Sequence, residues 1–337
     1  MPGCTGVDPV PRGKVVDASG FDIRHSLPQQ EDEFVVLMYH RVTKSEKPDF
    51  LPSALNCPVS RFLEHLTVLR KYCSILPLEE AWNLVREGRR LPPRTVVLTF
   101  DDCWYENMKT VLDPLAEAAI PATFFVSAGD IDREELHPDH RFYYLASQVG
   151  AEQLARGLQA ILSPPSMIPP EETAPWKLRH WLERVLGYEL ASPQGCVFLD
   201  TLEKGLGAPS SAGMGKTLYM ISDQVRSLLT YGVQVGNHTV NHRQLTALGE
   251  AEQRAELAEA QRILSALTGK PVRTLAYPYG LFNDISVKVA AELGHGCACT
   301  VIPGYNDGDT DPMRLCRIDV TRLPGQELTI RLLGATS

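Results

Sequence analysis

The sequence contains no long apolar segment and no block of basic residues. None of its 337 residues belongs to an apolar run near the roughly 20 residues that a membrane-spanning helix needs. Lysine and arginine number 33 against 41 aspartates and glutamates, a formal net charge of −8. An acidic chain without a basic block is a poor candidate for binding the phosphate backbone of nucleic acids. We therefore predict neither a transmembrane segment nor a nucleic-acid partner.

A secretory signal is also lacking. Residues 1–12 are polar and rich in glycine and proline, without the apolar stretch of such a signal. Eight cysteines are spread over the chain, whereas small disulfide-bonded domains concentrate theirs. Cys297 and Cys299 have apolar flanks, which favours a buried strand over a metal or redox site. We expect reduced thiols, a cytoplasmic location and a flexible tail over residues 1–30, and the oligomeric state stays open.

The apolar residues follow a strand–helix alternation. Short apolar runs at 34–39, 95–100 and 122–127 predict buried strands. Helical periodicity separates them, as at 60–71, where Ser60 is the expected N-cap. Strands and helices joined by short connections imply parallel pairing through right-handed crossovers. An α/β barrel-like fold follows.

The alternation stops at residue 130 and resumes at about 221. Residues 130–220 have helical stretches but no strand series. The flanking segments, 31–129 and 221–337, together have the size of a single α/β barrel. We therefore predict one catalytic barrel with a mainly helical insertion, which forms a lid or a substrate-recognition element near the mouth of the site.

Candidate ligand residues follow two of the predicted strands. Asp101 and Asp102 come directly after the strand at 95–100, and His238 and His242 follow the strand V-Q-V-G. Active sites of parallel α/β folds collect at the carboxyl ends of the strands. A spacing of four residues on one helical turn would place both imidazoles on one face. A third ligand from a carboxylate would complete a metal site with an open position for water.

Two further strand ends carry polar or turn-forming residues. The segment A-Y-P-Y-G at 276–280 predicts a sharp turn that could aim backbone N–H groups into the same mouth, although an ordinary strand-ending turn fits equally. His40 ends the first strand and has both a structural and a catalytic interpretation.

Taken in order, these motifs resemble a known family. T-F-D-D-C-W-Y-E-N at 99–107, A-T-F-F-V-S at 122–127, N-H-T-V-N-H at 237–242 and A-Y-P-Y-G are similar to the polysaccharide deacetylase family, also called the NodB-homology domain or carbohydrate esterase family 4. The resemblance extends from about Phe34 to Leu323, with 130–220 outside the common core. It implies a distorted (β/α)7-like barrel and metal-dependent removal of an acyl group, usually acetyl, from an N-acylated amino sugar.

The resemblance also assigns roles by position. Asp102, His238 and His242 resemble the metal ligands, Asp101 the catalytic base, and the backbone N–H of Tyr279 the oxyanion donor. The residues expected to contact substrate are Tyr39, Trp104, Tyr277, Pro278 and Tyr279. A His₂Asp site suits Zn²⁺, with Co²⁺, Ni²⁺ or Mn²⁺ as alternatives.

The sequence departs from the family pattern in two places. Ala276 stands where the family has an arginine that orients the base, and Arg314 or Arg317 could substitute. The late motif with the proton-donating histidine is not evident. Some relatives carry a Tyr-His motif at the first strand, which points to His40 as the general acid, with His295 as the alternative.

The leading hypothesis is a metal-dependent deacetylase that acts on an acylated amino sugar or a glycoconjugate intermediate. A bound metal would lower the pKa of water, and Asp101 would take its proton. The alternatives are a deformylase or another amide hydrolase on the same scaffold, and a catalytically silent carbohydrate-binding relative. Trp176 and Trp181 of the insertion are candidates for stacking on a sugar, with core packing as the other possibility.

Overall fold

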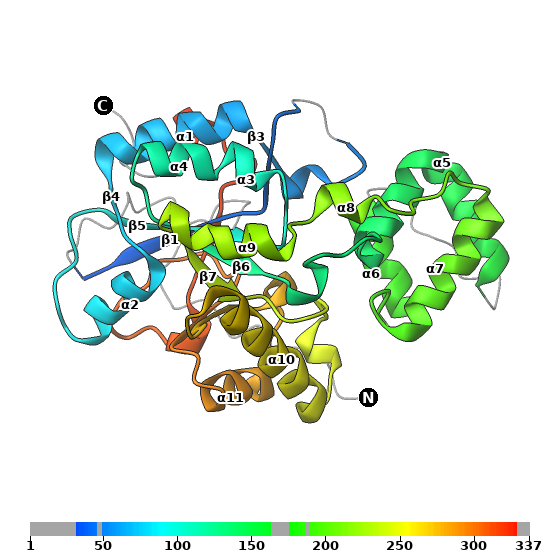
Figure 1. Cartoon of the computed structure of the whole chain (residues 1–337). Coiled ribbons are helices and arrows are strands. Elements are labelled where there is room, and N and C mark those ends of the chain that lie inside the picture. The colour runs from blue at the N-terminus through cyan, green and yellow to red at the C-terminus, as the bar shows by residue number, and fades with distance from the viewer. Residues whose placement is uncertain (1–31, 46–48, 163–174, 187–188, 329–337) are drawn as a thin grey trace.

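A parallel β-sheet forms the centre of the molecule (Figure 1). The computed structural model describes residues 32–45, 49–162, 175–186 and 189–328, so the tail predicted over residues 1–30 lies outside the described part. The strands of the sheet are β1 (Phe34–Tyr39), β4 (Ser74–Ile75), β5 (Thr95–Asp101), β6 (Thr123–Val126), β7 (Gln234–Asn237), β8 (Thr274–Ala276), β9 (Cys297–Cys299) and β10 (Ile318–Asp319). They pair in the order β10-β1-β5-β6-β7-β8-β9, with β4 beside β5.

The two edges of the sheet are joined by one segment near the C-terminus. Ile318 and Asp319 of β10 pair with β1, and Leu315 forms a parallel bridge with Cys299 of β9. Residues 315–319 therefore span the opening between the first and last strands. This closure confirms the predicted distorted barrel.

The strands have two buried faces, as their sequences predict. Every residue of β1 and β5 is buried. Because side chains alternate along a strand, Val35 and Leu37 pack toward the surrounding helices, whereas Phe34 and Val36 belong to a second cluster with helix α2 (Leu78–Arg86). A strand ending at the mouth thus sends neighbouring side chains to opposite sides, and this determines which residues reach the site.

The helices agree with the predicted positions, with two local corrections. Helix α1 (Val59–Tyr72) begins one residue before Ser60, so the N-cap is Pro58 and not Ser60. The segment between β5 and β6, which helical periodicity predicts to be helical, contains two short helices, α3 (Asn107–Thr110) and α4 (Leu112–Glu117). Pro114 explains the break, because its ring conflicts with the carbonyl of Thr110 four residues earlier.

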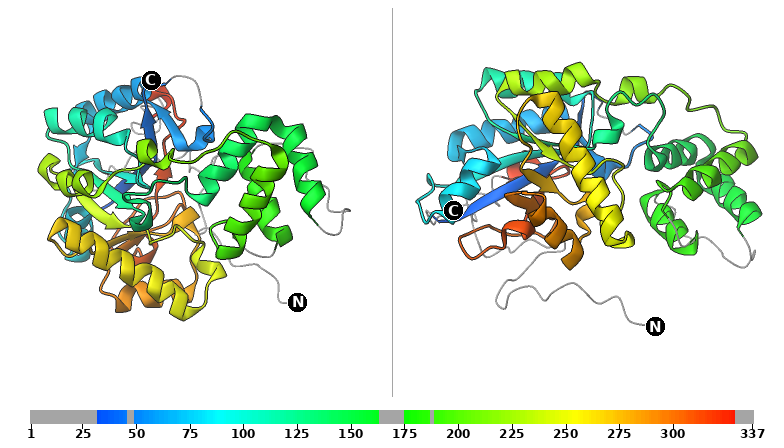
Figure 2. Two further views of the ribbon diagram at one scale, coloured as in Figure 1. Left: turned by 45° about the vertical axis from the view of Figure 1, so that its right-hand side comes forward. Right: turned by 60° about the horizontal axis from the view of Figure 1, so that its bottom comes forward.

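The described residues between positions 130 and 220 form a helical lobe beside the barrel, as Figures 1 and 2 show. It contains α5 (Pro138–Ile161), α6 (Pro175–Leu186), α7 (Pro193–Leu206) and α8 (Gly215–Leu218). Helix α5 bends at Gly150, whose φ is 75°. The chain then returns to the barrel through α9 (Ser222–Leu228), and α10 (Glu250–Thr268) and α11 (Asp284–Glu292) complete the outer layer.

Two small elements and the cysteines complete the description. Strands β2 (Arg41–Thr43) and β3 (Asn56–Pro58) pair in parallel apart from the main sheet. The seven cysteines of the described residues form no disulfide and are reduced, as expected. Among the described helices, none has the length and apolar character needed to cross a bilayer.

Candidate active site

Two adjacent carboxylates leave the end of β5 in different directions. Asp101 is the last residue of the strand and is 3% exposed, and Asp102 is 8% exposed. Asp102 has a φ of 72°, so the chain turns sharply between the two side chains. The turn gives each carboxylate separate partners.

Asp102 lies beside the two histidines of the H-x-x-x-H motif. Its Oδ1 is 3.7 Å from Nε2 of His238 and 3.4 Å from Nε2 of His242. A tetrahedral ion at about 2.0–2.2 Å from each donor separates its ligand atoms by about 3.3–3.6 Å. In the described part of the chain, these three residues are the group that could hold a metal ion. Their donor types and spacing fit a divalent cation.

The segment that carries the histidines is not the predicted helical turn. After β7 it runs as an irregular loop in which Thr239 and His242 have φ values of 65° and 51°. The two imidazoles still converge, with ring centroids 4.8 Å apart. The prediction that the two histidines lie together is correct, but the helical turn on which it was based is absent. Tertiary contacts determine the conformation of this loop instead.

Hydrogen bonds orient the candidate ligands. His238 Nδ1 donates to the carbonyl of Ala276 over 2.7 Å, because a carbonyl can only accept, and this directs the Nε2 lone pair to the cluster. Trp104 Nε1 donates to Asp102 Oδ2 over 3.0 Å. Trp104 is 1% exposed and does not line the cavity, so it supports this carboxylate here, and its contact with substrate stays a prediction.

The pKa of His242 also favours ligation. Burial lowers it well below its usual value, and the neighbouring His238, His137 and His140 lower it further. A neutral imidazole is the form that binds metal.

The structure selects Arg317 as the partner of Asp101. Its Nη1 and Nη2 donate to Oδ1 and Oδ2 of Asp101 over 2.7 and 2.8 Å, in a bidentate pair with both side chains buried. Burial raises the pKa of Asp101, but the charge of Arg317 outweighs it and the pKa lies below its usual value. Arg314 pairs elsewhere, with Asp284 and Asp311.

The first strand sends His40, and not Tyr39, into the site. Tyr39 is fully buried and stacks on Phe100, and its hydroxyl donates to His65 Nδ1. It does not line the cavity, and its contact with substrate stays a prediction. His40 lines the cavity with Asp101 and the histidine pair. Its Nδ1 has no hydrogen-bond partner within the described residues.

His295 lies outside the cavity. Its Nδ1 is 3.1 Å from the carbonyl of Ala290, and its Nε2 is 3.2 Å from Nδ2 of Asn237. Because the Ala290 carbonyl can only accept, Nδ1 carries a proton. The amide nitrogen of Asn237 can only donate, so Nε2 accepts and carries no proton. The imidazole of His295 is therefore neutral. Burial lowers the pKa of His295 to about 4.

The buried neutral His295 predicts a stability loss in acid. Its pKa is about 4 in the folded chain and 6.5 in the unfolded chain. The unfolded state therefore binds more protons in this interval, and stability falls as the pH drops from 6.5 to 4, by about 3 kcal/mol at most. Urea unfolding of the wild type and of His295→Gln across this range measures it. Equal pH slopes for the two proteins would contradict the prediction.

The A-Y-P-Y-G segment forms the predicted sharp turn. Tyr279 has a φ of 57° and Gly280 a φ of 68°. A Cβ at Gly280 would meet Val301 Cγ2 at 2.2 Å, so the turn also requires glycine for space. Tyr277 and Tyr279 line the cavity, and Tyr277 donates its hydroxyl to Met313. Pro278 is buried and does not line it.

The cavity that contains these groups measures about 250 Å³ and has walls from both parts of the chain. The barrel contributes the predicted residues at the strand ends. The insertion contributes residues that sequence reasoning missed, namely His137, Asp139, His140, Tyr143, Arg179 and His180. Their only signal was a group of ionisable residues at 137–140, where helix α5 begins. Of the two insertion tryptophans, Trp181 packs against the main core, and the side chain of Trp176 lies outside the described part.

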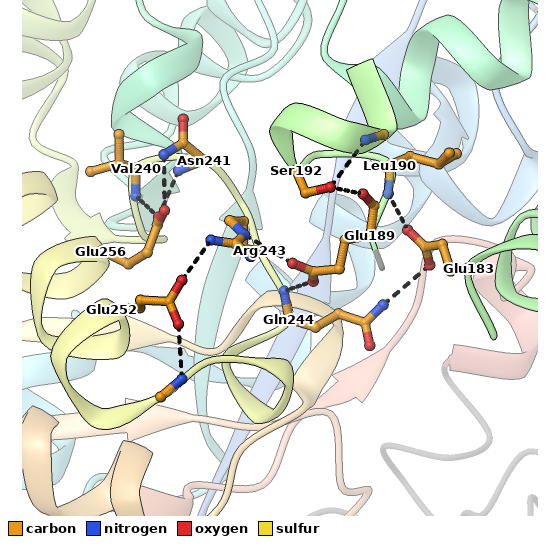
Figure 3. Close-up of polar contacts among 12 residues, drawn as sticks. Glu183, Glu189, Leu190, Ser192, Val240, Asn241, Arg243, Gln244, Glu252 and Glu256 are labelled. Atoms are coloured by element: carbon orange, nitrogen blue, oxygen red, sulfur yellow. Dashed lines mark hydrogen bonds and ion pairs between the residues drawn. The ribbon is translucent and has the colours of Figure 1, made fainter. Parts of the chain in front are cut away.

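The histidine loop is held from two sides, as Figure 3 shows. On the barrel side, Glu256 of α10 accepts from the backbone N–H groups of Val240 and Asn241 over 3.1 and 2.8 Å. On the insertion side, Glu189 accepts from Arg243 Nε over 2.9 Å and from the Gln244 N–H. The insertion thus takes part in shaping the loop that carries the candidate ligands.

A distorted α/β barrel with one carboxylate and two imidazoles gathered at its strand ends defines the structural class. A model of the polysaccharide deacetylase family matches residues 88–167 and 197–298, more than half of the chain. The chain therefore belongs to the polysaccharide deacetylase family, whose members are hydrolases of carbon–nitrogen bonds other than peptide bonds. The resemblance in the motifs is confirmed at this level.

Individual relatives are distant. The Bacillus subtilis (strain 168) protein named "Putative polysaccharide deacetylase YxkH" is 24% identical over 120 residues, which are 32% of this chain and 43% of that protein. The chain thus matches less than half the length of this curated relative. Among solved structures, the Streptococcus pyogenes deacetylase PplD in complex with acetate has a TM-score of 0.58 at 17% identity, covering 89% of this chain and 98% of its own. IcaB from Ammonifex degensii has a TM-score of 0.57 at 18% identity, covering 90% and 98%. These two likenesses support the fold alone.

Proposed function

We propose that the protein is a metal-dependent deacetylase that hydrolyses the N-acetyl amide of an acylated amino sugar or glycoconjugate intermediate. One observation carries the proposal: the cluster of Asp102, His238 and His242 shares a cavity with the buried Asp101–Arg317 pair. The deacetylase names of the structural neighbours support it. A cytoplasmic location remains a prediction from the sequence.

The chain's own residues divide the chemistry among themselves. A divalent cation, with Zn²⁺ as our first choice, would be held by Asp102, His238 and His242, where it lowers the pKa of water and polarises the amide carbonyl. Asp101 is kept anionic by Arg317 and accepts the proton from water. The backbone N–H of Tyr279 donates to the oxyanion. His40 gives its proton to the leaving amine.

The role of His40 predicts a selective loss of activity. His40→Ala is expected to lower kcat by about 10²- to 10⁴-fold, which is the usual contribution of a general acid. Substrates with an acidic aniline leaving group should lose less, because that group departs without protonation. Steady-state kinetics with both substrate types measures the difference. His295→Gln is the control and should stay near the wild-type rate, and the opposite ranking would assign the acid to His295.

The activity itself is tested with a substrate panel. Purified protein loaded with Zn²⁺ is incubated with N-acetyl and N-formyl amino sugars, and free amine is measured with and without a chelator. We expect chelator-sensitive amine release from N-acetyl substrates. Release from N-formyl substrates alone would identify a deformylase, and no release from any substrate by the loaded protein would overturn the proposal.

A further inference from the structure

Three ionic residues of the insertion form a buried bridge, which we call the insertion bridge: Asp139 of α5, and Arg179 and Glu183 of α6. Arg179 is 1% exposed. Its Nη1 lies 3.1 Å from Asp139 Oδ2 and 3.2 Å from the carboxylate oxygens of Glu183. A buried guanidinium is stable only with such partners, so the three side chains act as one unit.

At one end, the insertion bridge contacts the side chain of Tyr279. Asp139 accepts a hydrogen bond from the Tyr279 hydroxyl, and the guanidinium of Arg179 lies 4.8 Å from the centre of the Tyr279 ring. The side chain of Tyr279 is therefore fixed at its tip by a carboxylate and on its face by a cation.

The other end reaches the histidine loop. Glu183 accepts from Gln244 Nε2 over 3.2 Å and from the Leu190 N–H over 3.1 Å. Tyr279 in turn contacts His242, with ring centroids 4.6 Å apart. The insertion bridge thus links the turn at 276–280 to the loop that carries two candidate ligands.

The backbone conformation of Tyr279 explains why its side chain needs these contacts. A tyrosine at a φ of 57° occupies a sparsely populated conformation, which persists only when its surroundings enforce it. Gly280 behind it packs against Val301 and fixes the next peptide. The contacts of Asp139 and Arg179 hold the side chain, and the side chain holds the turn.

We propose that Asp139 and Arg179 are positioning residues for catalysis: the insertion holds the Tyr279 peptide in the orientation that its N–H needs to meet the oxyanion. This inference rests on the proposed function. Both residues line the cavity wall, where Asp139 is hydrogen-bonded to the Tyr279 hydroxyl and Arg179 lies over the Tyr279 ring, so we assign their effect to Tyr279.

Two isosteric variants test the inference. Asp139→Asn keeps the shape of the side chain, and Tyr279→Phe removes only the hydroxyl and leaves every charge in place. Each is expected to lower kcat by about 10- to 100-fold, the usual effect of losing a supporting contact, with little change in KM. Because both remove the same link, the double variant should be no slower than the slower single variant.

The chain offers a matched control within the insertion. Arg141 of α5 pairs with Asp200 and Glu203 of α7, away from the cavity. Arg141→Gln removes an ion pair from the same lobe and should lower the melting temperature without lowering kcat. If it reduces kcat as much as Asp139→Asn does, the effect is general loosening of the insertion, and the inference fails.

Hydrogen exchange tests this inference without measuring catalysis, and so separates it from the proposed function. Hydrogen exchange of the peptide covering residues 276–281 should be at least about tenfold faster in Asp139→Asn and Tyr279→Phe than in the wild type, and unchanged in Arg141→Gln. Wild-type exchange in both variants, or wild-type kcat in Tyr279→Phe, would overturn the inference. An inactive wild type whose variants show the faster exchange would overturn only the proposed function.

Discussion

Asp102→Ala is expected to abolish metal binding and amine release together. The variant loses one of three converging donor atoms and the acceptor of the Trp104 N–H. Loss of the ion removes several kcal/mol of transition-state stabilisation, equivalent to a rate reduction of about 10³-fold or more. Metal content by elemental analysis and amine release with excess substrate measure the two effects.

Asp101→Asn is the matched control, because it changes the neighbouring carboxylate and leaves the metal ligands intact. We expect it to keep the bound metal and to lose activity through the missing base. If Asp102→Ala retained both a full complement of metal and its activity, the assigned ligand set would be wrong. If Asp101→Asn lost the metal instead, the roles of the two aspartates would be exchanged.

Arg317→Met is expected to produce the largest loss of stability. Arg317 and Asp101 are both buried and joined by two hydrogen bonds, so removal of the guanidinium leaves a buried carboxylate without a counter-charge. Breaking such a pair from one side costs about 3–5 kcal/mol. With the charge of Arg317 removed, burial would raise the pKa of Asp101, and the base would be protonated at a higher pH. Denaturant unfolding and the pH profile of kcat report these effects.

The double variant Asp101→Asn/Arg317→Met separates charge from packing. With both charges removed, no unpaired ion remains, and the double variant should be more stable than Arg317→Met alone. A double variant less stable than this single variant would show that the unpaired Asp101 carboxylate is not the source of the lost stability. Arg317→Lys, which keeps the charge but not the bidentate geometry, should fall between the wild type and Arg317→Met.

The predicted parts of the structure depend on local patterns. The buried strands follow from apolar runs such as 34–39 and 95–100, because a strand covered on both faces needs apolar side chains at every position. The candidate ligands follow from residue type and from position directly after a strand. Both signals are contained in a few consecutive residues.

The unpredicted parts depend on long-range contacts. Arg317 and Asp101 are 216 residues apart, and nothing near Arg317 distinguished it from Arg314. The loop at 238–244 takes its shape from Glu256 and Glu189, neither of which belongs to the motif. The contribution of Arg179 depends on how the helical lobe docks, which no periodicity determines.

A different kind of limit applies to Tyr39 and His40, which the sequence places together at a strand end although only His40 lines the cavity. The sequence indicated that the motif stands at the end of a strand, but not which of two neighbours faces inward. Alternation along β1 settles this, since Tyr39 stacks outward on Phe100 and the next residue enters the cavity.

The closing segment at 315–319 has a consequence for folding. It carries Arg317 and also joins the two edges of the sheet, so closure of the barrel and the counter-charge of Asp101 depend on the same five residues. A conformation in which this segment has detached would keep the cluster of Asp102, His238 and His242 but would leave the Asp101 carboxylate without its partner. Local opening of the barrel and loss of the oriented carboxylate are therefore expected to occur as one event.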